Sequence, residues 1–393
     1  MSGLKQVAAV VAISIRSIPQ RLSMASATVV GVALAVLVLL GFLSMANGFR
    51  KTLDSTGSSN VAILVADGAR SEADSVVSAD QYRRLLDAPG IARNAGGPIM
   101  AGEAYVVVNA SRRGGGEDAN VPLRGTTAQG LAVREGFALG SGRMFAAGSR
   151  EIVIGRALGT QLAGFDLGST VRIGPGEWTI VGIVDAGGSA LESEIWADLG
   201  VVQGLFRSDN ALQSVRLRPA SPAAIPAIEA YLRADPTLKL DLVNEQAFFA
   251  GQARGLSRMI RYLGWPLAVL MALGALAGAL NTLHSSVAAR ASEIATLRTI
   301  GFGRFATFCG VLAEALLLAA AGAVAGVGLG ALLLHDLTSS SVGAGMTTMS
   351  FRLQLSFGIV GSAVALAMTV GLVGGAIAAW RAARQPILEG LAR

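Results

Sequence analysis

The feature that most constrains this chain is a set of four long apolar stretches. A helix needs about 20 residues to cross the hydrocarbon core of a bilayer. Each stretch is long enough: residues 24–46, 262–287, 305–334 and 355–380. Only 15% of the 393 residues are charged, against about 25% in a soluble domain. The sequence therefore predicts an α-helical membrane protein with four transmembrane helices.

Lysine and arginine are concentrated in three short flanks of these stretches: the N-terminal tail, the segment 288–304 and the tail 381–393. Flanks rich in Lys and Arg stay in the cytosol, as the positive-inside rule states. We therefore expect both termini and segment 288–304 to be cytosolic, with the protein in the inner (cytoplasmic) membrane and region 47–261 periplasmic. The net charge of +6 then reflects topology and does not indicate nucleic-acid binding.

The region 47–261 is large enough to form its own core. Alternating apolar residues predict strands at 60–67, 103–110 and 239–245. Ser78 begins a predicted helix that ends at Pro89, and residues 151–184 hold short strands separated by glycine turns. We expect a large extracytoplasmic α/β domain in which an α/β subdomain, built from both ends of the region, carries an inserted β-rich subdomain.

The sequence lacks the residues that catalysis by this chain alone would need. A P-loop requires a lysine after glycine, and none of Lys5, Lys51 and Lys239 follows one. The two histidines, His284 and His335, lie outside the large domain, so we expect neither a zinc site nor a catalytic triad there. Its carboxylates show no spacing that singles out an acid–base pair. We expect no enzyme activity, no metal and no cofactor in this chain.

Glu314 is the one carboxylate well inside a predicted span. Ionisable groups in a membrane are functional candidates by default, but a proton relay would need a second buried carboxylate. We therefore favour a structural role for Glu314 at a helix contact. Glycines four residues apart predict close helix packing in three spans, without identifying the partner. They are Gly274 and Gly278; Gly322, Gly326 and Gly330; and Gly371 and Gly375.

The N-terminal residues 1–23 predict a cytosolic amphipathic helix. Its apolar face would be formed by Leu4, Val7, Val11 and Ile15. The alternative is that this segment is only the flank of the first span, and both interpretations can hold together. A cleavable signal peptide fits less well, because the apolar stretch is long and no small-residue cleavage site precedes a mature domain.

The segment "VAARASEIATLRTIGFGRFATF" between the second and third spans resembles the MacB/FtsX-like permease family of ABC transporters. In that family an acidic-Ile pair, a basic residue and a glycine-containing turn lie here, and they match Glu293-Ile294, Arg298 and Gly301. The stretch "REIVIGRALGTQLAGFDLGSTVRIGPGEWTIVGIVDAGGSALESEIWADL" resembles the family's periplasmic core domain. The ending "AARQPILEGL" resembles its terminal pattern.

The resemblance implies that segment 288–304 is a coupling helix that docks on a separate ABC ATP-binding subunit. An apolar strip of Ile294, Leu297 and Ile300 suits insertion into a groove; the alternative is a polar loop whose charges face solvent. The residues expected to make this contact are Arg290, Glu293, Ile294, Leu297, Arg298 and Gly301. The resemblance further implies two ATPase copies that bind ATP and Mg²⁺, a second permease protomer in a homodimer or in a close heterodimer with a paralogous permease, and a possible periplasmic adaptor or lipoprotein.

The function implied is that of a permease subunit, which couples ATP hydrolysis to movement of the periplasmic domain in export or extraction of a lipophilic, lipoprotein or drug-like substrate. Two alternatives stay open: a regulator that activates a cell-wall hydrolase, and an ATP-independent secondary transporter, which would show inverted repeats. The expected segments are 1–23, 24–46 (first span), 47–261, 262–287 (second span), 288–304, 305–334 (third span), 335–354 (short external loop), 355–380 (fourth span) and 381–393.

Overall fold

The computed structural model describes residues 3–16, 19, 22–115, 118–207, 211–289, 291–334, 337–342 and 347–384. The chain divides into two compact units. We call the first the membrane unit; it comprises Met1–Asn47, Arg258–Leu337 and Leu353–Arg393. The second, the α/β unit, comprises Gly48–Ser257 and Thr338–Arg352, so the chain passes between the two units at four points.

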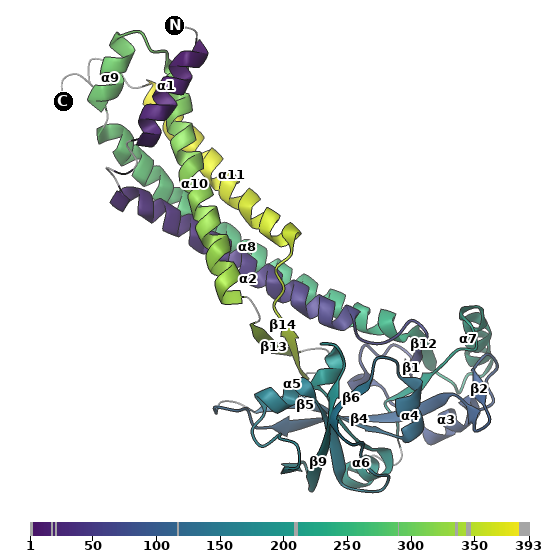
Figure 1. Ribbon diagram of the computed structural model, residues 1–393. Coiled ribbons are helices and arrows are strands. Elements are labelled where there is room, and N and C mark those ends of the chain that lie inside the picture. Colours follow the sequence, from purple (N-terminus) through teal and green to yellow (C-terminus); the bar gives the residue numbers. More distant parts are fainter. Residues whose placement is uncertain are drawn as a thin grey trace. The chain divides into compact units, whose positions relative to one another are not determined.

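The membrane unit is built from helices (Figure 1). They are α1 (Gly3–Arg16), α2 (Leu22–Asp54), α8 (Glu245–Ala289), α9 (Ala291–Thr299), α10 (Arg304–Leu334) and α11 (Phe357–Arg384). Helices α2, α8, α10 and α11 are long and apolar enough to cross a membrane, which confirms the four expected spans.

Helices α2 and α8 are longer than the apolar stretches that identified them. Helix α2 continues to Asp54 and α8 already begins at Glu245, so both belong partly to the α/β unit. Hydropathy locates the part of a helix that lies in lipid, but it does not detect a polar continuation of the same helix in water. The expected domain limits of 47 and 261 therefore fall inside helices.

Two of the three predicted glycine stripes pack helices together. A Cβ atom added to Gly326 of α10 would lie 2.7 Å from the carbonyl oxygen of Ala33 in α2, and one added to Gly375 of α11 would lie 2.6 Å from Ala315 of α10. Only glycine permits these close backbone approaches. The third stripe differs, because a Cβ added to Gly274 or Gly278 of α8 would meet no described atom within 4 Å.

The α/β unit contains one ten-stranded sheet in the order β12-β1-β11-β4-β5-β10-β7-β9-β6, with β8 paired to β9. The strands are β1 (Ala62–Ala66), β4 (Met100–Ala110), β5 (Ala119–Thr126), β6 (Ala138–Gly142), β7 (Glu151–Gly155), β8 (Thr170–Ile173), β9 (Gly176–Asp185), β10 (Ile195–Asp198), β11 (Ser214–Leu217) and β12 (Leu240–Asn244). A two-stranded β2 (Arg93–Asn94) and β3 (Gly97–Pro98) lies apart from this sheet.

The expected two-part layout is present as two cores along that single sheet. The first core covers β1, β11 and β12 with α3 (Ala79–Leu85) and α7 (Ile225–Ala234), so it comes from both ends of the region. The second surrounds β5, β7, β9 and β10 with α5 (Arg156–Gln161) and α6 (Leu199–Phe206). Strand β4 joins them, because it pairs with β11 at one end and with β5 at the other.

Short helices complete the α/β unit. They are α4 (Ala128–Val133) and the 3₁₀ turns η2 (Glu72–Asp74), η3 (Ala190–Ser193) and η4 (Pro222–Ala224). Helix α3 begins as predicted, with a reciprocal capping box between Ser78 and Gln81. It ends at Leu85, several residues before the expected stop at Pro89, because the chain tightens into turns there.

The predicted external loop between the third and fourth spans forms a β-hairpin. Strand β13 (Thr338–Val342) pairs antiparallel with β14 (Thr348–Arg352), and both belong to the α/β unit although the helices on either side belong to the membrane unit. Nothing in its Ser- and Gly-rich sequence predicted this hairpin.

Candidate functional site

The expected coupling segment folds as the short helix α9, at the same end of the membrane unit as α1 (Figure 1). Glu293, Ile294, Leu297 and Arg298 lie in α9, whereas Arg290 lies outside the described residues. Gly301 follows the helix with φ +103°, a conformation that favours glycine. The glycine of the motif therefore ends α9 and turns the chain toward α10.

One residue of the expected apolar strip is plainly exposed. Ile300 follows the last residue of α9 and is 71% exposed, whereas Ala295 in the middle of the helix is buried. Contiguous exposed apolar patches mark surfaces that contact a partner, whereas single exposed apolar side chains are ordinary. The docking surface expected on this segment therefore stays a prediction.

Helix α1 holds the turn that follows α9. The side-chain amide of Gln6 donates to the carbonyl oxygen of Gly301 at 3.3 Å, and the backbone N–H of Gly303 donates to the side-chain oxygen of Gln6 at 3.4 Å. Sequence analysis missed Gln6, because nothing in the pattern of the N-terminal segment relates it to residues almost 300 positions away.

The buried face of α1 overlaps the predicted apolar face in part. Val7 and Val11 of the predicted face are half-buried beside the buried Val10 and Ser14, whereas Ile15 is 40% exposed. A Cβ added to Gly310 of α10 would lie 2.7 Å from Val10, so this glycine lets α10 approach α1 on the side of Val10 and Ser14. Packing against Gly310 therefore centres the buried face on Val10 and Ser14, which hydrophobic periodicity did not identify.

Glu314 is buried, at 8% exposure, in the middle of α10. It lies one helical turn after Gly310 and one turn before Leu318, which are also buried. This position places Glu314 on the face of α10 that packs against neighbouring helices. The structural role predicted for Glu314 stays a prediction.

The α/β unit contains a group of charged side chains that the sequence analysis did not single out. Each is at most 7% exposed. We call this group the ion network; its members are Glu72, Glu103, Arg124, Arg134, Glu194, Arg216 and Glu245. They come from η2, β4, β5, the end of α4, the end of η3, β11 and the first residue of α8.

Arg124 lies at the centre of the ion network. Its guanidinium group donates to Glu194 at 2.7 and 2.9 Å, to Glu72 at 2.8 and 2.9 Å, and to Glu103 at 2.9 Å. These five bonds use every N–H group that a guanidinium carries. Both carboxylate oxygens of Glu194 accept from Arg124, so this pair is bidentate.

Glu103 is shared among three arginines. It accepts from Arg124, from Arg216, and from Arg134 at 2.6 Å. Burial opposes the ionisation of Glu103, but the positive charges of Arg134, Arg216 and Arg124 together outweigh it and lower its pKa to about 2. Burial likewise opposes the ionisation of Glu72, and its arginine partners hold its pKa well below the ordinary value.

Strand register explains why these charges meet. Arg124 of β5 stands opposite Tyr105 of β4, and Glu103, two residues earlier on the same face of β4, stands opposite Ser214 of β11. Trp196 of β10 stands opposite Arg124 on the other side. The tyrosine and tryptophan rings lie 5.0 and 5.5 Å from the Arg124 guanidinium, so aromatic faces cover the cation where carboxylates do not.

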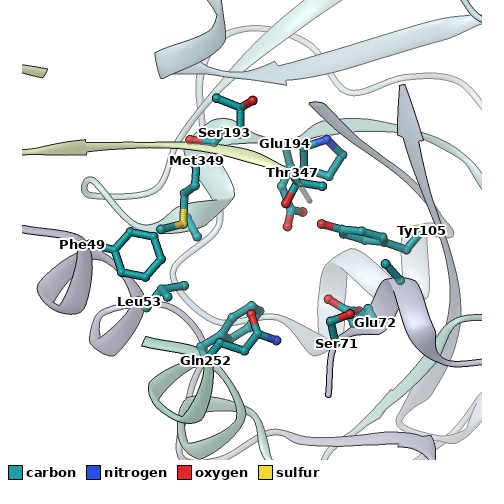
Figure 2. A pocket seen from close by; sticks show the side chains of 15 residues that line it. Phe49, Leu53, Ser71, Glu72, Tyr105, Ser193, Glu194, Gln252, Thr347 and Met349 are labelled. Atoms are coloured by element: carbon teal, nitrogen blue, oxygen red, sulfur yellow. The ribbon is translucent and has the colours of Figure 1, made fainter. Parts of the chain in front are cut away.

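A small cavity of about 50 Å³ lies beside the ion network, within the α/β unit. Figure 2 shows Phe49 and Leu53 of α2 on one side of it and Tyr105 and Glu72 on the other. Residues of α8 and β14 complete the lining, among them Gln252 and Met349. The cavity is therefore the place where α2, α8 and the β13–β14 hairpin meet the sheet.

This arrangement does not have the properties of a catalytic acid–base pair. A general acid needs a carboxyl with a raised pKa, whereas the pKa values of Glu72 and Glu103 are lowered by their arginine partners. Among the described residues, no group of three or more His, Cys, Asp or Glu side chains could hold a metal ion. The ion network fixes elements of the fold by charge-assisted hydrogen bonds.

A weak sequence signal for the ion network does exist. Glu103, Arg124 and Arg216 each lie inside a strand between apolar residues, as in "SVRL". Successive side chains alternate between the two faces of a strand, so each of these charged residues lies on the face opposite to its apolar neighbours. In a sheet with one solvated face, that second face would be in water. The sequence alone does not reveal that this second face is also covered.

The fold and these features define a polytopic membrane protein of the permease type, with a large α/β unit built mostly from the chain between its first and second spans and completed by the hairpin between its third and fourth. Residues 25–235 match the family model described as the MacB-like periplasmic core domain, and residues 266–387 match the FtsX-like permease C-terminal model. The chain belongs to the MacB/FtsX-like family of ABC transporter permeases, as expected from its motifs. Proteins of this family are permease components and are not themselves catalytic.

Solved structures give a more distant likeness. The extracellular domain of the ABC-type transporter YknZ from Gram-positive bacteria is 19% identical, covers 43% of this chain and 88% of its own, and has a TM-score of 0.34. The periplasmic region of MacB from Actinobacillus actinomycetemcomitans is 13% identical, covers 48% of this chain and 90% of its own, and has a TM-score of 0.35. No curated protein matches the chain.

Proposed function

We propose that this chain is the permease subunit of an ABC transporter complex, and that it transmits the work of ATP hydrolysis by a separate ATPase to its α/β unit. The observation that carries the proposal is the FtsX-like permease match over 266–387, which includes α9. The family motif of Glu293-Ile294 and Arg298, with the turn at Gly301, supports α9 as the element that contacts the ATPase. ATP and Mg²⁺ would bind to that partner.

We further propose that the α/β unit lies outside the cytosol and that both termini and α9 lie inside it, with the protein in the inner membrane. The excess of Lys and Arg in the N-terminal tail, in segment 288–304 and in the tail 381–393 supports this orientation. The match to a periplasmic core domain over 25–235 supports the location of the α/β unit.

We propose that two permease chains work together with two ATPase subunits, because ABC ATPases close as a pair. Helix α8 supports this pairing. It packs within its own chain through a narrow row of alanines, whereas Gly274 and Gly278 are exposed. Asn281 is exposed as well, and a polar side chain in hydrocarbon is stabilised by a hydrogen bond to another helix. A monomeric permease bound to an active ATPase pair in native mass spectrometry would contradict this.

The test of the function is the double variant Glu293→Ala with Leu297→Ala, purified in nanodiscs. Truncating one interface anchor typically costs about 1–3 kcal/mol, which is about a 5- to 150-fold loss of affinity. We expect the variant to insert normally, but to co-purify with less ATPase subunit and to lose its effect on ATP hydrolysis. The matched control is Ser292→Ala with Thr299→Ala, two exposed positions of the same helix.

The readouts are the amount of ATPase subunit retained and its rate of ATP hydrolysis. Normal retention and a normal effect on hydrolysis in the double variant would rule out α9 as the coupling element. Equal losses in the control would mean that the helix itself had been disrupted, and that the contact is not specific to Glu293 and Leu297.

A further inference from the structure

Hydrogen bonds on both strands join the β13–β14 hairpin to the rest of the α/β unit. The backbone N–H of Ser350 donates to the hydroxyl of Ser193 at 3.1 Å, and the Ser350 hydroxyl donates to Gln161 of α5 at 2.8 Å. Arg112 donates to the Ser340 hydroxyl at 3.2 Å. Ser350 is buried, so these bonds are shielded from water.

The hairpin is also packed against the C-terminal end of α2. The ring of Phe351, which is buried, meets the ring of Phe49 edge to face, with 5.6 Å between centroids. A Cβ added to Gly48 would collide with the carbonyl oxygen of Arg352, so glycine is needed for this approach. Strand β14 therefore lies directly on the α2 backbone.

Three elements that continue into the membrane unit converge on the ion network. The hairpin bonds to Ser193, and the next residue, Glu194, is the bidentate partner of Arg124. Helix α8 begins with Glu245, which accepts from Arg216 at 2.6 Å. The segment that follows α2 is joined to the same residue, because the backbone N–H of Ser58 donates to Glu245 at 3.2 Å.

We propose that the ion network holds together three elements that continue into the membrane unit, which we call arms: α2, α8 and the β13–β14 hairpin. The hairpin is the third arm, through which displacement of α10 and α11 reaches the α/β unit. This inference rests on the proposed function and extends it, because α2 and α8 are the two arms formed by continuous helices. Buried, bidentate ion pairs keep their geometry under load better than exposed contacts. A displacement of any arm therefore moves the sheet as one body.

The experiment uses the full permease with its ATPase subunit in nanodiscs. Hydrogen exchange is measured by mass spectrometry in peptides of β4, β5 and β10, before and after ATP with vanadate. The variant Ser193→Ala with Ser350→Ala and Phe351→Ala removes the side-chain partners of the hairpin's bonds to η3 and α5 and its ring contact with α2, and it leaves the Arg112–Ser340 bond in place. The matched control is Thr338→Ala with Ser341→Ala, on β13 of the same hairpin.

We expect the ATP-dependent change in exchange of β4, β5 and β10 to fall at least twofold in the triple variant and to persist in the control, with ATPase retention unchanged in both. A change equal to that of the unaltered protein would overturn the third arm. If the unaltered protein does not retain the ATPase subunit, or shows no ATP-dependent change in exchange, the proposed function on which the inference rests would be overturned instead.

A second experiment keeps the proposal testable if the triple variant folds poorly. Ser193→Cys with Ser350→Cys, in a chain without its native cysteine, is treated with a short bismethanethiosulfonate cross-linker that restores the fastening. We expect the ATP-dependent change to be weak before cross-linking and restored after it. The same change with and without the cross-linker would overturn the hairpin's role.

Discussion

Replacing Arg124 by methionine tests whether the ion network stabilises the α/β unit. Methionine has a similar length but no charge, so the substitution removes five hydrogen bonds at once. Glu72 and Glu103 keep Arg216 as a partner. Glu194 is left buried without the guanidinium that bonds both its oxygens.

Leaving one member of a buried ion pair without its partner costs about 3–5 kcal/mol. In a domain of 150 to 250 residues, each kcal/mol shifts the melting temperature by about 2–4 °C. The expected decrease for Arg124→Met is therefore roughly 6–20 °C. By contrast, Arg233→Met removes a surface pair with Glu229, and such pairs contribute about 0–1 kcal/mol.

The assay is thermal unfolding of the full chain in detergent, followed by tryptophan fluorescence, since Trp178 and Trp196 are both buried in the α/β unit. Adding Glu194→Gln to Arg124→Met removes the stranded charge, so we expect the double variant to regain at least part of the lost melting temperature. The reasoning is refuted if Arg124→Met melts like the Arg233→Met control, or if the double variant is no more stable than the single one.

Three further predictions concern pH, topology and packing. Because the pKa of Glu103 is lowered from 4.5 to about 2, its stabilisation is complete above pH 4.5 and is lost as the pH falls toward 2; a melting temperature that stayed constant or rose over this range would contradict it. In a variant without the native cysteine, cysteine at Ser141 should react with an impermeant thiol reagent in intact cells and cysteine at Thr299 should not; the reverse pattern would invert the topology. Gly326→Val should reduce the yield of folded protein, because its Cβ would lie 2.7 Å from the α2 backbone, whereas Gly328→Val should be tolerated because no described atom lies within 4 Å; equal yields would refute the packing argument.

Features that depend on neighbouring residues could be predicted from the sequence. Four spans follow from apolar runs of bilayer length, and the start of α3 follows from the Ser78 and Gln81 capping box. The glycine spacings on α10 and α11 predicted close packing because a helix repeats its faces every few residues. Family membership could also be predicted, since its motifs are short and contiguous.

Contacts between residues far apart in the sequence depend on the folded chain and could not be predicted from the sequence. The ion network brings Glu72 and Glu245 to Arg216, and no local pattern relates residues that far apart. The hairpin's attachment at Ser193 depends on a surface that exists only after the sheet has formed. The same holds for the face that α1 buries and for the glycines of α8 that stay exposed, because hydrophobic periodicity identifies a helix and not the neighbour that covers it.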